Sequence, residues 1–332
     1  MAQNKRTVVM VGFLLMMVQP SMELRLKQRI KEIVGGGSSY IGLLMTFPTE
    51  ELALQNSGYF VPNSNIPWVD LAGRRFNIGK IKGVNVIYVM SGEQTVNAGI
   101  TVQILVDVFD IEGVVHYGIA GSANDSLSIA DVVVPTHVAF TNSWKWKEFN
   151  SEKGQYPEMK FGDFDFPSEG GNLLGKIEFT PKQLYSTGKQ MQEVFWLPID
   201  SKWLSIAAQL QDLKLEQCLN ETYCLPNTPK VVYGLRGSTA DIYLDNAAFG
   251  EFLFKQLNVS TVDEESAAVV TTCLSNEVPS IVFRGVSDFA GREGKLRRTT
   301  SLSPSSLAAI NALKVAVQFI GLLQQQATFH DH

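Results

Sequence analysis

An acidic residue that directly follows a long apolar run is the strongest chemical signal in this sequence. Residues 281–286 are typical of a buried strand, and Ser287 and Asp288 come immediately after them. Open α/β sheets bind their ligands at the carboxyl ends of the strands, so Asp288 is a candidate for a functional site. Glu265 and Glu50 are further carboxylates near the ends of apolar segments.

Several common chemistries lack their motifs. His330 and His332 lie in the C-terminal tail, and His116 and His137 have no second ligand at zinc spacing. There is no Gly-x-Ser-x-Gly elbow, and residues 73–80 resemble a phosphate-binding loop but lack its Ser or Thr. From the sequence we therefore expect neither a metal nor a bound cofactor, and neither a hydrolase triad nor nucleoside triphosphate chemistry.

Length and composition indicate a globular α/β protein. With 332 residues, 45% hydrophobic and 18% charged, the chain can bury the core of one large domain or two small ones. The net charge is −5 and the basic residues are scattered, so a nucleic-acid polymer is not expected as a partner.

The N-terminus has the pattern of a secretory signal peptide, predicted over residues 1–21. Lys5 and Arg6 precede an apolar run at 8–18, and Gln19-Pro20-Ser21 ends it. The run is short for a membrane span; an N-terminal anchor or a buried strand is the alternative. We expect a secreted or vacuolar protein whose mature form does not contact a membrane.

The cysteines fit an oxidising compartment. Cys218 and Cys224 lie six residues apart among turn residues and can close a small disulfide loop, whereas Cys273 is expected to be a buried thiol. Asn220 and Asn258 begin glycosylation sequons. The sequon at Asn124 is expected to stay unused, because it falls in the candidate site.

Apolar periodicity predicts alternating strands and helices, and therefore a mostly parallel sheet covered by helices on both faces. The predicted strands are 40–45, 84–90, 114–121, 131–135, 231–235 and 281–286, and the predicted helices are 96–109, 264–274 and one that starts at Ser303-Pro304. Between residues 144 and 203 the pattern is weak and predicts long loops that carry aromatic residues. We expect one domain over residues 38–326, followed by a tail at 327–332.

Three motifs, in this order and spacing, resemble the purine nucleoside and uridine phosphorylase superfamily, and in particular its 5′-methylthioadenosine/S-adenosylhomocysteine nucleosidase branch. They are residues 117–122, 262–268 and 285–288. Residues 73–76 and 144–146 and the secretory N-terminus are most similar to plant bark storage and vegetative storage proteins and cytokinin riboside phosphorylases. The resemblance implies a three-layer αβα sandwich around a mixed, partly barrel-like sheet, a small-molecule nucleoside as partner, and a homo-oligomer.

The resemblance also implies roles for the carboxylates. Cleavage of the bond between ribose and a purine leaves negative charge on the base and positive charge on the sugar. Asp288 would protonate the base, which requires a raised pKa that burial can supply. Glu265 would bind the ribose hydroxyls with Glu264 beside it, where the family usually has methionine. Alternatively, these acids simply favour the N-terminus of a helix.

The attacking group stays open between water and inorganic phosphate. Glu50 matches the glutamate with which the nucleosidases activate water, although it could merely begin a helix on the surface. Phosphate would bind at Ser91, Gly92 and Thr95, yet neither 42–57 nor 84–97 contains a lysine or arginine. A phosphate dianion there would depend on backbone amides and hydroxyls.

The resemblance places the base beside a set of strand-end residues that favour a purine: Ala120, Gly121, Asp241, Ile242 and Ser287. Trp144, Trp146 and Phe47 would widen the pocket for an N6-prenylated adenine. The main hypothesis is an enzyme that cleaves purine or cytokinin nucleosides. The alternatives are a vegetative storage protein on the same fold and a protein that binds nucleosides without cleaving them.

Overall fold

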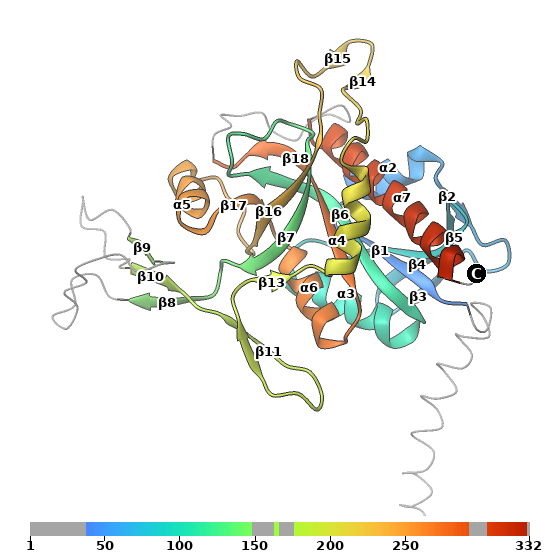
Figure 1. Cartoon of the computed structure of the whole chain (residues 1–332), viewed down its shortest axis with the longest axis horizontal. Coiled ribbons are helices and arrows are strands. Elements are labelled where there is room, and N and C mark those ends of the chain that lie inside the picture. The colour runs from blue at the N-terminus through green and yellow to red at the C-terminus, as the bar shows by residue number, and fades with distance from the viewer. Residues whose placement is uncertain (1–37, 148–162, 166–175, 292–303, 331–332) are drawn as a thin grey trace, which may run out of the picture.

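A mixed sheet of eleven strands is the centre of the molecule (Figure 1). The computed structural model describes residues 38–147, 163–165, 176–291 and 304–330; the predicted signal peptide lies outside these ranges. The strands of the sheet, in chain order, are β1 (Tyr40–Met45), β2 (Phe60–Pro62), β3 (Trp68–Leu71), β4 (Arg74–Ile81), β5 (Val84–Met90), β6 (Ile111–Ser122), β7 (Val132–Phe140), β13 (Leu197–Pro198), β16 (Val231–Thr239), β17 (Val259–Asp263) and β18 (Ser280–Phe289).

Four parallel strands bring their carboxyl ends to one edge. β1 pairs in parallel with β5 and with β6, and β18 pairs in parallel with β6. The residues that follow β1 and β5 therefore meet the final residues of β6 and β18. This is the edge at which an α/β sheet binds ligands.

Part of the sheet closes into a ring. β6 pairs with β18, β18 with β7, β7 with β16, β16 with β17, and β17 returns to β6. The pairs β17–β6 and β18–β7 are antiparallel, whereas the other three are parallel. The mixed, partly barrel-like sheet implied by the resemblance is thus present.

Helices cover both faces of the sheet because its central strands are apolar on both sides. Alternate residues of β1 contribute to two different cores, Leu43 and Met45 to one and Tyr40 and Leu44 to the other. The first core includes α7 (Pro304–His330), α2 (Pro48–Ser57) and α4 (Ser201–Ala207), and the second includes α3 (Thr95–Val108). α6 (Ser266–Ser275) contributes residues to both cores. These are the three layers.

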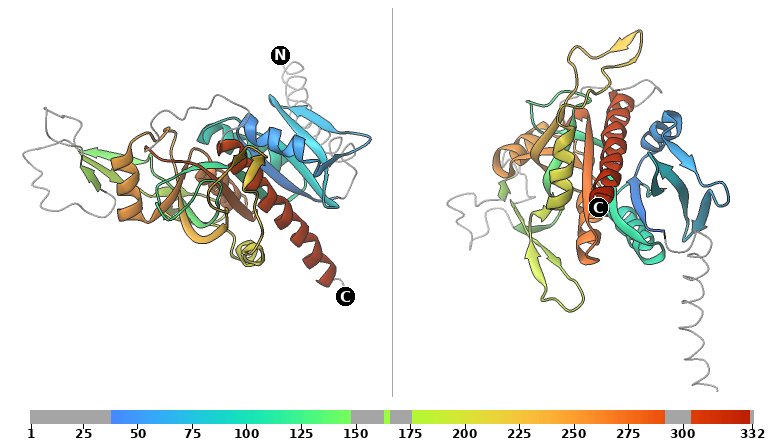
Figure 2. Two further views of the ribbon diagram at one scale, coloured as in Figure 1. Left: turned by 90° about the horizontal axis from the view of Figure 1, so that it is seen from above. Right: turned by 45° about the vertical axis from the view of Figure 1, so that its right-hand side comes forward.

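α7 is the longest helix of the described residues and packs along β18 and β6 (Figure 2). It is long and apolar enough to cross a membrane by composition, but 61% of its most apolar window is buried inside the protein, as in a core helix. It begins at Pro304, as the sequence predicts, and continues to His330, so it extends into the predicted tail. Its C-terminal end projects beyond the sheet (Figure 2).

The remaining elements lie outside the central sheet. Helix α5 (Ala247–Leu257) packs beside β17, with its side chains in a separate aromatic cluster. The other elements are the strands β8 (Trp144–Lys147), β9 (Asp163–Asp165), β10 (Lys176–Phe179), β11 (Lys182–Leu184), β12 (Gln192–Val194), β14 (Cys218–Asn220) and β15 (Tyr223–Cys224), and the short helix η1 (Ala208–Leu210). The β14–β15 hairpin projects from the body and carries the disulfide between Cys218 and Cys224 (Figure 1).

Several boundaries differ from those the sequence predicts: β6, β7 and β16 are longer than their predicted strands, and two further differences lie beside the candidate site. α6 begins at Ser266 instead of Glu264, because Asp263, at the end of β17, accepts hydrogen bonds from the amides of Glu265 and Ser266 and so holds a turn before the helix. β18 does not stop at Asp288 but continues to Phe289, with a shift in register between Val286 and Asp288.

Candidate active site

Glu50 lies buried at the carboxyl edge of the sheet. It is the third residue of α2, and only 1% of it is exposed. One carboxylate oxygen, Oε2, accepts hydrogen bonds from the amides of Thr46 (2.8 Å) and Phe47 (3.0 Å), and Oε1 accepts one from the amide of Ile119 (2.8 Å). Glu50 does begin a helix, but it is not on the surface. The fold holds its carboxylate against β1 and β6.

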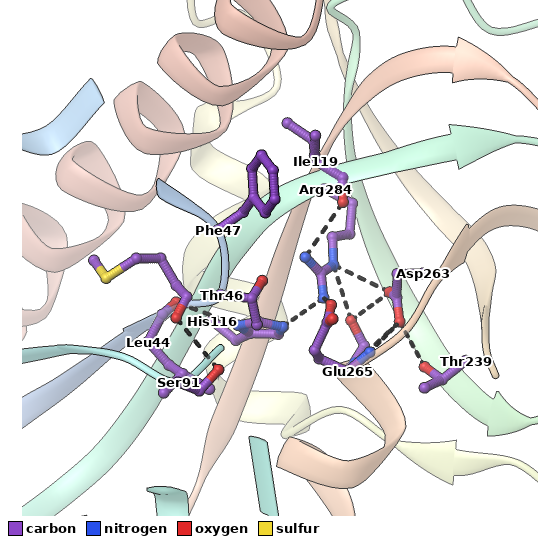
Figure 3. A network of polar contacts seen from close by, with 12 residues as sticks. Leu44, Thr46, Phe47, Ser91, His116, Ile119, Thr239, Asp263, Glu265 and Arg284 are labelled. Atoms are coloured by element: carbon purple, nitrogen blue, oxygen red, sulfur yellow. Dashed lines mark hydrogen bonds and ion pairs between the residues drawn. The ribbon is translucent and has the colours of Figure 1, made fainter. Parts of the chain in front are cut away.

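Arg284, in the middle of β18, places a positive charge beside these carboxyl groups, and only 1% of it is exposed (Figure 3). Its Nε donates to Asp263 Oδ2 (3.1 Å) and to Ser266 Oγ (3.0 Å), and its Nη2 lies 3.4 Å from Glu265 Oε2. A methyl group on Gly118 would lie 2.4 Å from both Arg284 Nη1 and Glu50 Oε1. Glycine at this position therefore lets the guanidinium and the carboxylate approach each other.

Asp263 and Glu265 respond differently to the same arginine. Burial opposes ionisation of Asp263, but Arg284 and the hydrogen bonds from Ser266 and Thr239 hold its pKa below the ordinary value. Burial raises the pKa of Glu265 to about 8, and the more distant Arg284 contact only partly offsets this. Glu265 and Arg284 lie within ion-pair distance, yet burial has the larger effect on the Glu265 pKa. Arg284 lies closer to Asp263 than to Glu265.

His116 completes the cluster from β6. Its Nε2 lies against Nη2 of Arg284, and its Nδ1 is 3.2 Å from the carbonyl oxygen of Leu44 (Figure 3). Burial and the charge of Arg284 lower the pKa of His116 to about 3, so the ring is neutral. From the sequence, this histidine was weighed only as a metal ligand.

Asp288 lies beside the glycine-rich end of β6. A methyl group on Gly121 would lie 2.9 Å from Asp288 Oδ1, and the Ser287 hydroxyl donates to Asp288 Oδ2 at 2.7 Å. Ser287 is also 3.2 Å from the carbonyl oxygen of Ala120. The register shift at this point of β18 is a bulge, a feature that often redirects side chains at functional sites. Four predicted residues thus meet here, with Asp288 half-buried.

The residues predicted to hold phosphate have other partners. The Thr95 amide and hydroxyl both donate to Asp241, each at 2.8 Å, and the Ser91 hydroxyl donates to the carbonyl oxygen of Gly92 at 2.8 Å. Asp241, predicted to border the base, is exposed and caps the N-terminus of α3, and Ile242 beside it is 41% exposed. The structure therefore links Thr95, at the start of α3, to Asp241, which follows β16.

Glu264 and Trp144, which the sequence predicts to border the ribose and the base, lie on different elements of the fold. Glu264 is half-buried at the end of β17. Trp144 packs against Phe179 in the cluster around α5, with its ring nitrogen donating to the Thr141 carbonyl oxygen. Trp144 thus packs in a satellite core that also includes Val262, and its place in a wide base pocket stays a prediction.

The sequons differ in their accessibility. Asn124 is 7% exposed, and its Nδ2 donates to Ser260 Oγ, so this sequon is unsuited to a glycan, in line with the expectation. Asn220 and Asn258 are exposed, on the β14–β15 hairpin and at the end of α5. Cys273 is fully buried and free, as predicted.

Sequence reasoning missed Arg284, His116 and Gln94. The backbone amide of Gln94 donates to Glu265 Oε1 at 3.0 Å, a role that no side-chain pattern can reveal. Arg284 had a signal, since a charged residue inside a fully apolar strand must be paired when it is buried.

Comparisons with known proteins agree with this architecture. Residues 40–321 match the family model described as the phosphorylase superfamily. The chain is 42% identical over 310 residues to bark storage protein A of Populus deltoides, and the match covers 92% of this chain and 96% of that protein. It is 26% identical over 241 residues to a 5′-methylthioadenosine/S-adenosylhomocysteine nucleosidase of Bacillus cytotoxicus, covering 73% and 84%.

Solved structures show the same fold at lower identity. A 5′-methylthioadenosine/S-adenosylhomocysteine nucleosidase of S. pneumoniae, solved with a transition-state inhibitor, aligns with a TM-score of 0.58 at 19% identity, over 86% of this chain and 99% of that one. Futalosine hydrolase of Helicobacter pylori aligns with a TM-score of 0.58 at 19% identity, over 85% and 97%. The family match and the extent of these similarities lead to one conclusion: the chain belongs to the phosphorylase superfamily.

Proposed function

We propose that the protein cleaves the N-glycosidic bond of purine nucleosides with water as the attacking group. The observation that carries this proposal is the carboxylate of Glu50, buried beside Arg284 at the edge where Asp288 and Glu265 also lie. Its Oε1 accepts one hydrogen bond among the described residues, from Ile119, which leaves that oxygen capacity to accept a proton from water.

The roles of the residues follow from the charge that develops in the reaction. Glu50 takes a proton from water as the oxygen bonds to the sugar carbon, and the bond from that carbon to the base nitrogen breaks. Asp288 donates a proton to the base, with Ser287 orienting its carboxyl group. The Glu265 carboxyl group binds the ribose hydroxyls through hydrogen bonds and fixes the ring. The products are free base and ribose.

Charge and hydrogen bonding favour water over phosphate. In the described part of the chain, three carboxylates, those of Glu50, Asp263 and Glu265, surround the guanidinium of Arg284. A phosphate dianion would add charge to a cluster that already has excess negative charge. The amides at the start of α3 that could cradle phosphate donate instead to the carboxylates of Glu265 and Asp241.

Incubation of the purified protein with adenosine, inosine and isopentenyladenosine tests this proposal. Free base is followed with and without inorganic phosphate. We expect release that does not depend on phosphate and that is lost in Asp288→Asn. Release that requires phosphate would refute the role of water, and saturable binding without release would indicate a binding protein.

A storage role is the second candidate, favoured by the 42% identity to bark storage protein A. A storage protein needs the fold but no competent site. Neither binding nor cleavage of any of the three nucleosides, by a protein that unfolds cooperatively, would support it. Retention of the buried Glu50–Arg284–Glu265 cluster favours the enzyme, because a buried charged cluster is costly to keep without a use.

We also propose that the protein enters the secretory pathway and resides in a vacuole or outside the cell. The disulfide between Cys218 and Cys224 supports this, because such bonds persist in oxidising compartments. N-terminal sequencing of the mature protein is expected to find residues 1–21 removed. An intact N-terminus in the native protein would contradict the proposal.

A further inference from the structure

We infer that His116 is a positioning residue: its Nε2 holds one amino group of Arg284 and thereby leaves the Glu265 carboxyl group available to the sugar hydroxyls of the substrate. This role presupposes the nucleoside site proposed above. It concerns a buried side chain that contacts no substrate and acts through the arginine beside it.

The hydrogen bonds of His116 define one tautomer. A guanidinium group only donates hydrogen bonds, so the ring nitrogen Nε2 that faces Arg284 Nη2 must accept. Nδ1 therefore has the proton and donates it to the Leu44 carbonyl oxygen at 3.2 Å. The ring is fully buried on β6, and its lowered pKa agrees with a neutral imidazole. His116 thus connects Arg284 to the backbone of β1.

His116 and Glu265 compete for the same amino group. Nη2 of Arg284 lies closer to His116 Nε2 than to Glu265 Oε2, from which it is 3.4 Å away. The other nitrogens of the guanidinium are held elsewhere, Nε by Asp263 and Ser266 and Nη1 by the Ile119 carbonyl oxygen at 3.4 Å. The arginine is consequently prevented from forming a tight pair with Glu265.

The other groups around Glu265 cannot take the place of His116 as the acceptor for Arg284 Nη2. Arg284 faces it from β18, Asp263 from the end of β17, Glu50 from α2, and the Gln94 amide from the start of α3. Without the acceptor on His116, Nη2 would turn toward the nearest carboxylate oxygen, that of Glu265. A tighter pair would lower the Glu265 pKa and occupy the oxygen that the ribose hydroxyls need.

Two variants separate the contacts of the imidazole. In His116→Gln, the side-chain amide reaches the position of Nε2 and can still accept from Arg284. In His116→Asn, the shorter amide replaces Nδ1 and can still donate to Leu44, but it cannot reach the arginine. Both are polar and neutral, so a difference between them reports the Arg284 contact instead of general packing.

The direct measurement is the pKa of Glu265 in the full-length protein. The side-chain carboxyl groups of the glutamates are labelled with ¹³C. The Glu265 signal is assigned by its loss in Glu265→Gln. We expect His116→Asn to lower this pKa by about one pH unit or more, and His116→Gln to leave it unchanged. In steady-state kinetics with adenosine, His116→Asn should raise KM about tenfold, with a smaller change in kcat.

The same experiments can overturn the inference. Equal pKa shifts in the two variants, or no shift in either, would mean that His116 only fills space. A wild-type protein that cleaves no nucleoside but shows the pKa difference would refute the proposed function while keeping the control of Arg284. If the variants fail to fold, ¹⁵N spectra of the wild-type histidines decide: a cationic His116 at pH 6 would refute the arrangement.

Discussion

At the residue scale, two neighbouring carboxyl groups, those of Asp263 and Glu265, are kept in different states of ionisation by their surroundings. Asp263 accepts a hydrogen bond from the nearer nitrogen of Arg284 and stays ionised, whereas burial raises the pKa of Glu265. Glu50 accepts four hydrogen bonds, two of them from Thr46. These differences separate a structural anion from the two groups that we propose act on the substrate.

Replacement of Glu50 by glutamine tests its role as a base. The glutamine side chain nearly matches glutamate in size but could not take a proton from water. We expect Glu50→Gln to reduce the rate of base release by about 10²–10⁴-fold. The neighbouring Glu51, which is only partly buried, provides the control, and Glu51→Gln should retain near wild-type activity. Equal losses in both variants would contradict the assignment.

The raised pKa of Glu265 predicts a pH dependence of stability. Since this pKa rises from 4.5 to about 8 on folding, the folded protein holds a proton in that range that the unfolded chain has released. Its contribution to stability is therefore full below about pH 4.5 and is lost as the pH rises to about 8.

Urea unfolding of wild type and Glu265→Gln between pH 5 and 9 measures this contribution. The glutamine variant cannot ionise, so its stability relative to the wild type should increase with pH across this range. A difference in unfolding free energy that is independent of pH would mean that Glu265 has an ordinary pKa.

At the scale of elements, the start of α3 contains a strained residue. Gln94 has φ 78° and ψ 162°, a conformation that is almost restricted to glycine. The conformation directs the Gln94 amide toward Glu265 Oε1, while the next amide, that of Thr95, meets Asp241. The helix N-terminus is thus attached to the site by two carboxylates, which also benefit from the helix dipole.

Gln94→Gly should relieve this strain while it keeps the amide. We expect the free energy of unfolding to rise by about 1 kcal/mol, because the strain exceeds the entropy cost of glycine. Asp107→Gly, at an exposed position near the end of the same helix, should instead lower it by up to about 1 kcal/mol. Urea denaturation of both variants checks this; a similar loss in both would show that Gln94 is unstrained.

At the scale of the whole molecule, one glycine allows the long helix α7 to pack on the sheet. A methyl group on Gly285 would lie 2.2 Å from the backbone oxygen of Ala308, so strand and helix approach closely at this point. Gly285 follows Arg284 in β18. β18 therefore contributes both to the candidate site and to the contact with α7.

Gly285→Ala should lower the free energy of unfolding by about 1–3 kcal/mol, because the helix backbone must move away. Gly99→Ala in α3 is the matched control, since its methyl group would meet its nearest neighbour, Thr272, at an ordinary 3.6 Å. That variant should be neutral or stabilising, because alanine favours helix. Thermal unfolding of both proteins distinguishes them. Equal stabilities would refute the close approach.

Local patterns explain why the strands β1, β5, β6, β7, β16 and β18 and the helices α3, α6 and α7 were predictable. The apolar runs of β1, β5, β6 and β18 and the periodicity of α3 and α7 appear in the sequence because these elements are buried on continuous faces. The short strands from β8 to β12 have no such pattern, and the sequence predicts loops with aromatic residues in their place. Boundaries were less certain where a side chain such as Asp263 ends one element and accepts hydrogen bonds from the amides at the start of the next.

The sequence by itself determined six strands of the sheet, the helices α3, α6 and α7, the disulfide spacing and the family motifs, because each depends on residues close together in the chain. Only the tertiary structure decided that Glu50, His116, Glu265 and Arg284 form one buried cluster, and that Thr95 binds Asp241. Parallel strands far apart in sequence meet at one edge of the sheet, and burial there sets the ionisation of each group. Neither proximity nor burial is encoded in any short segment.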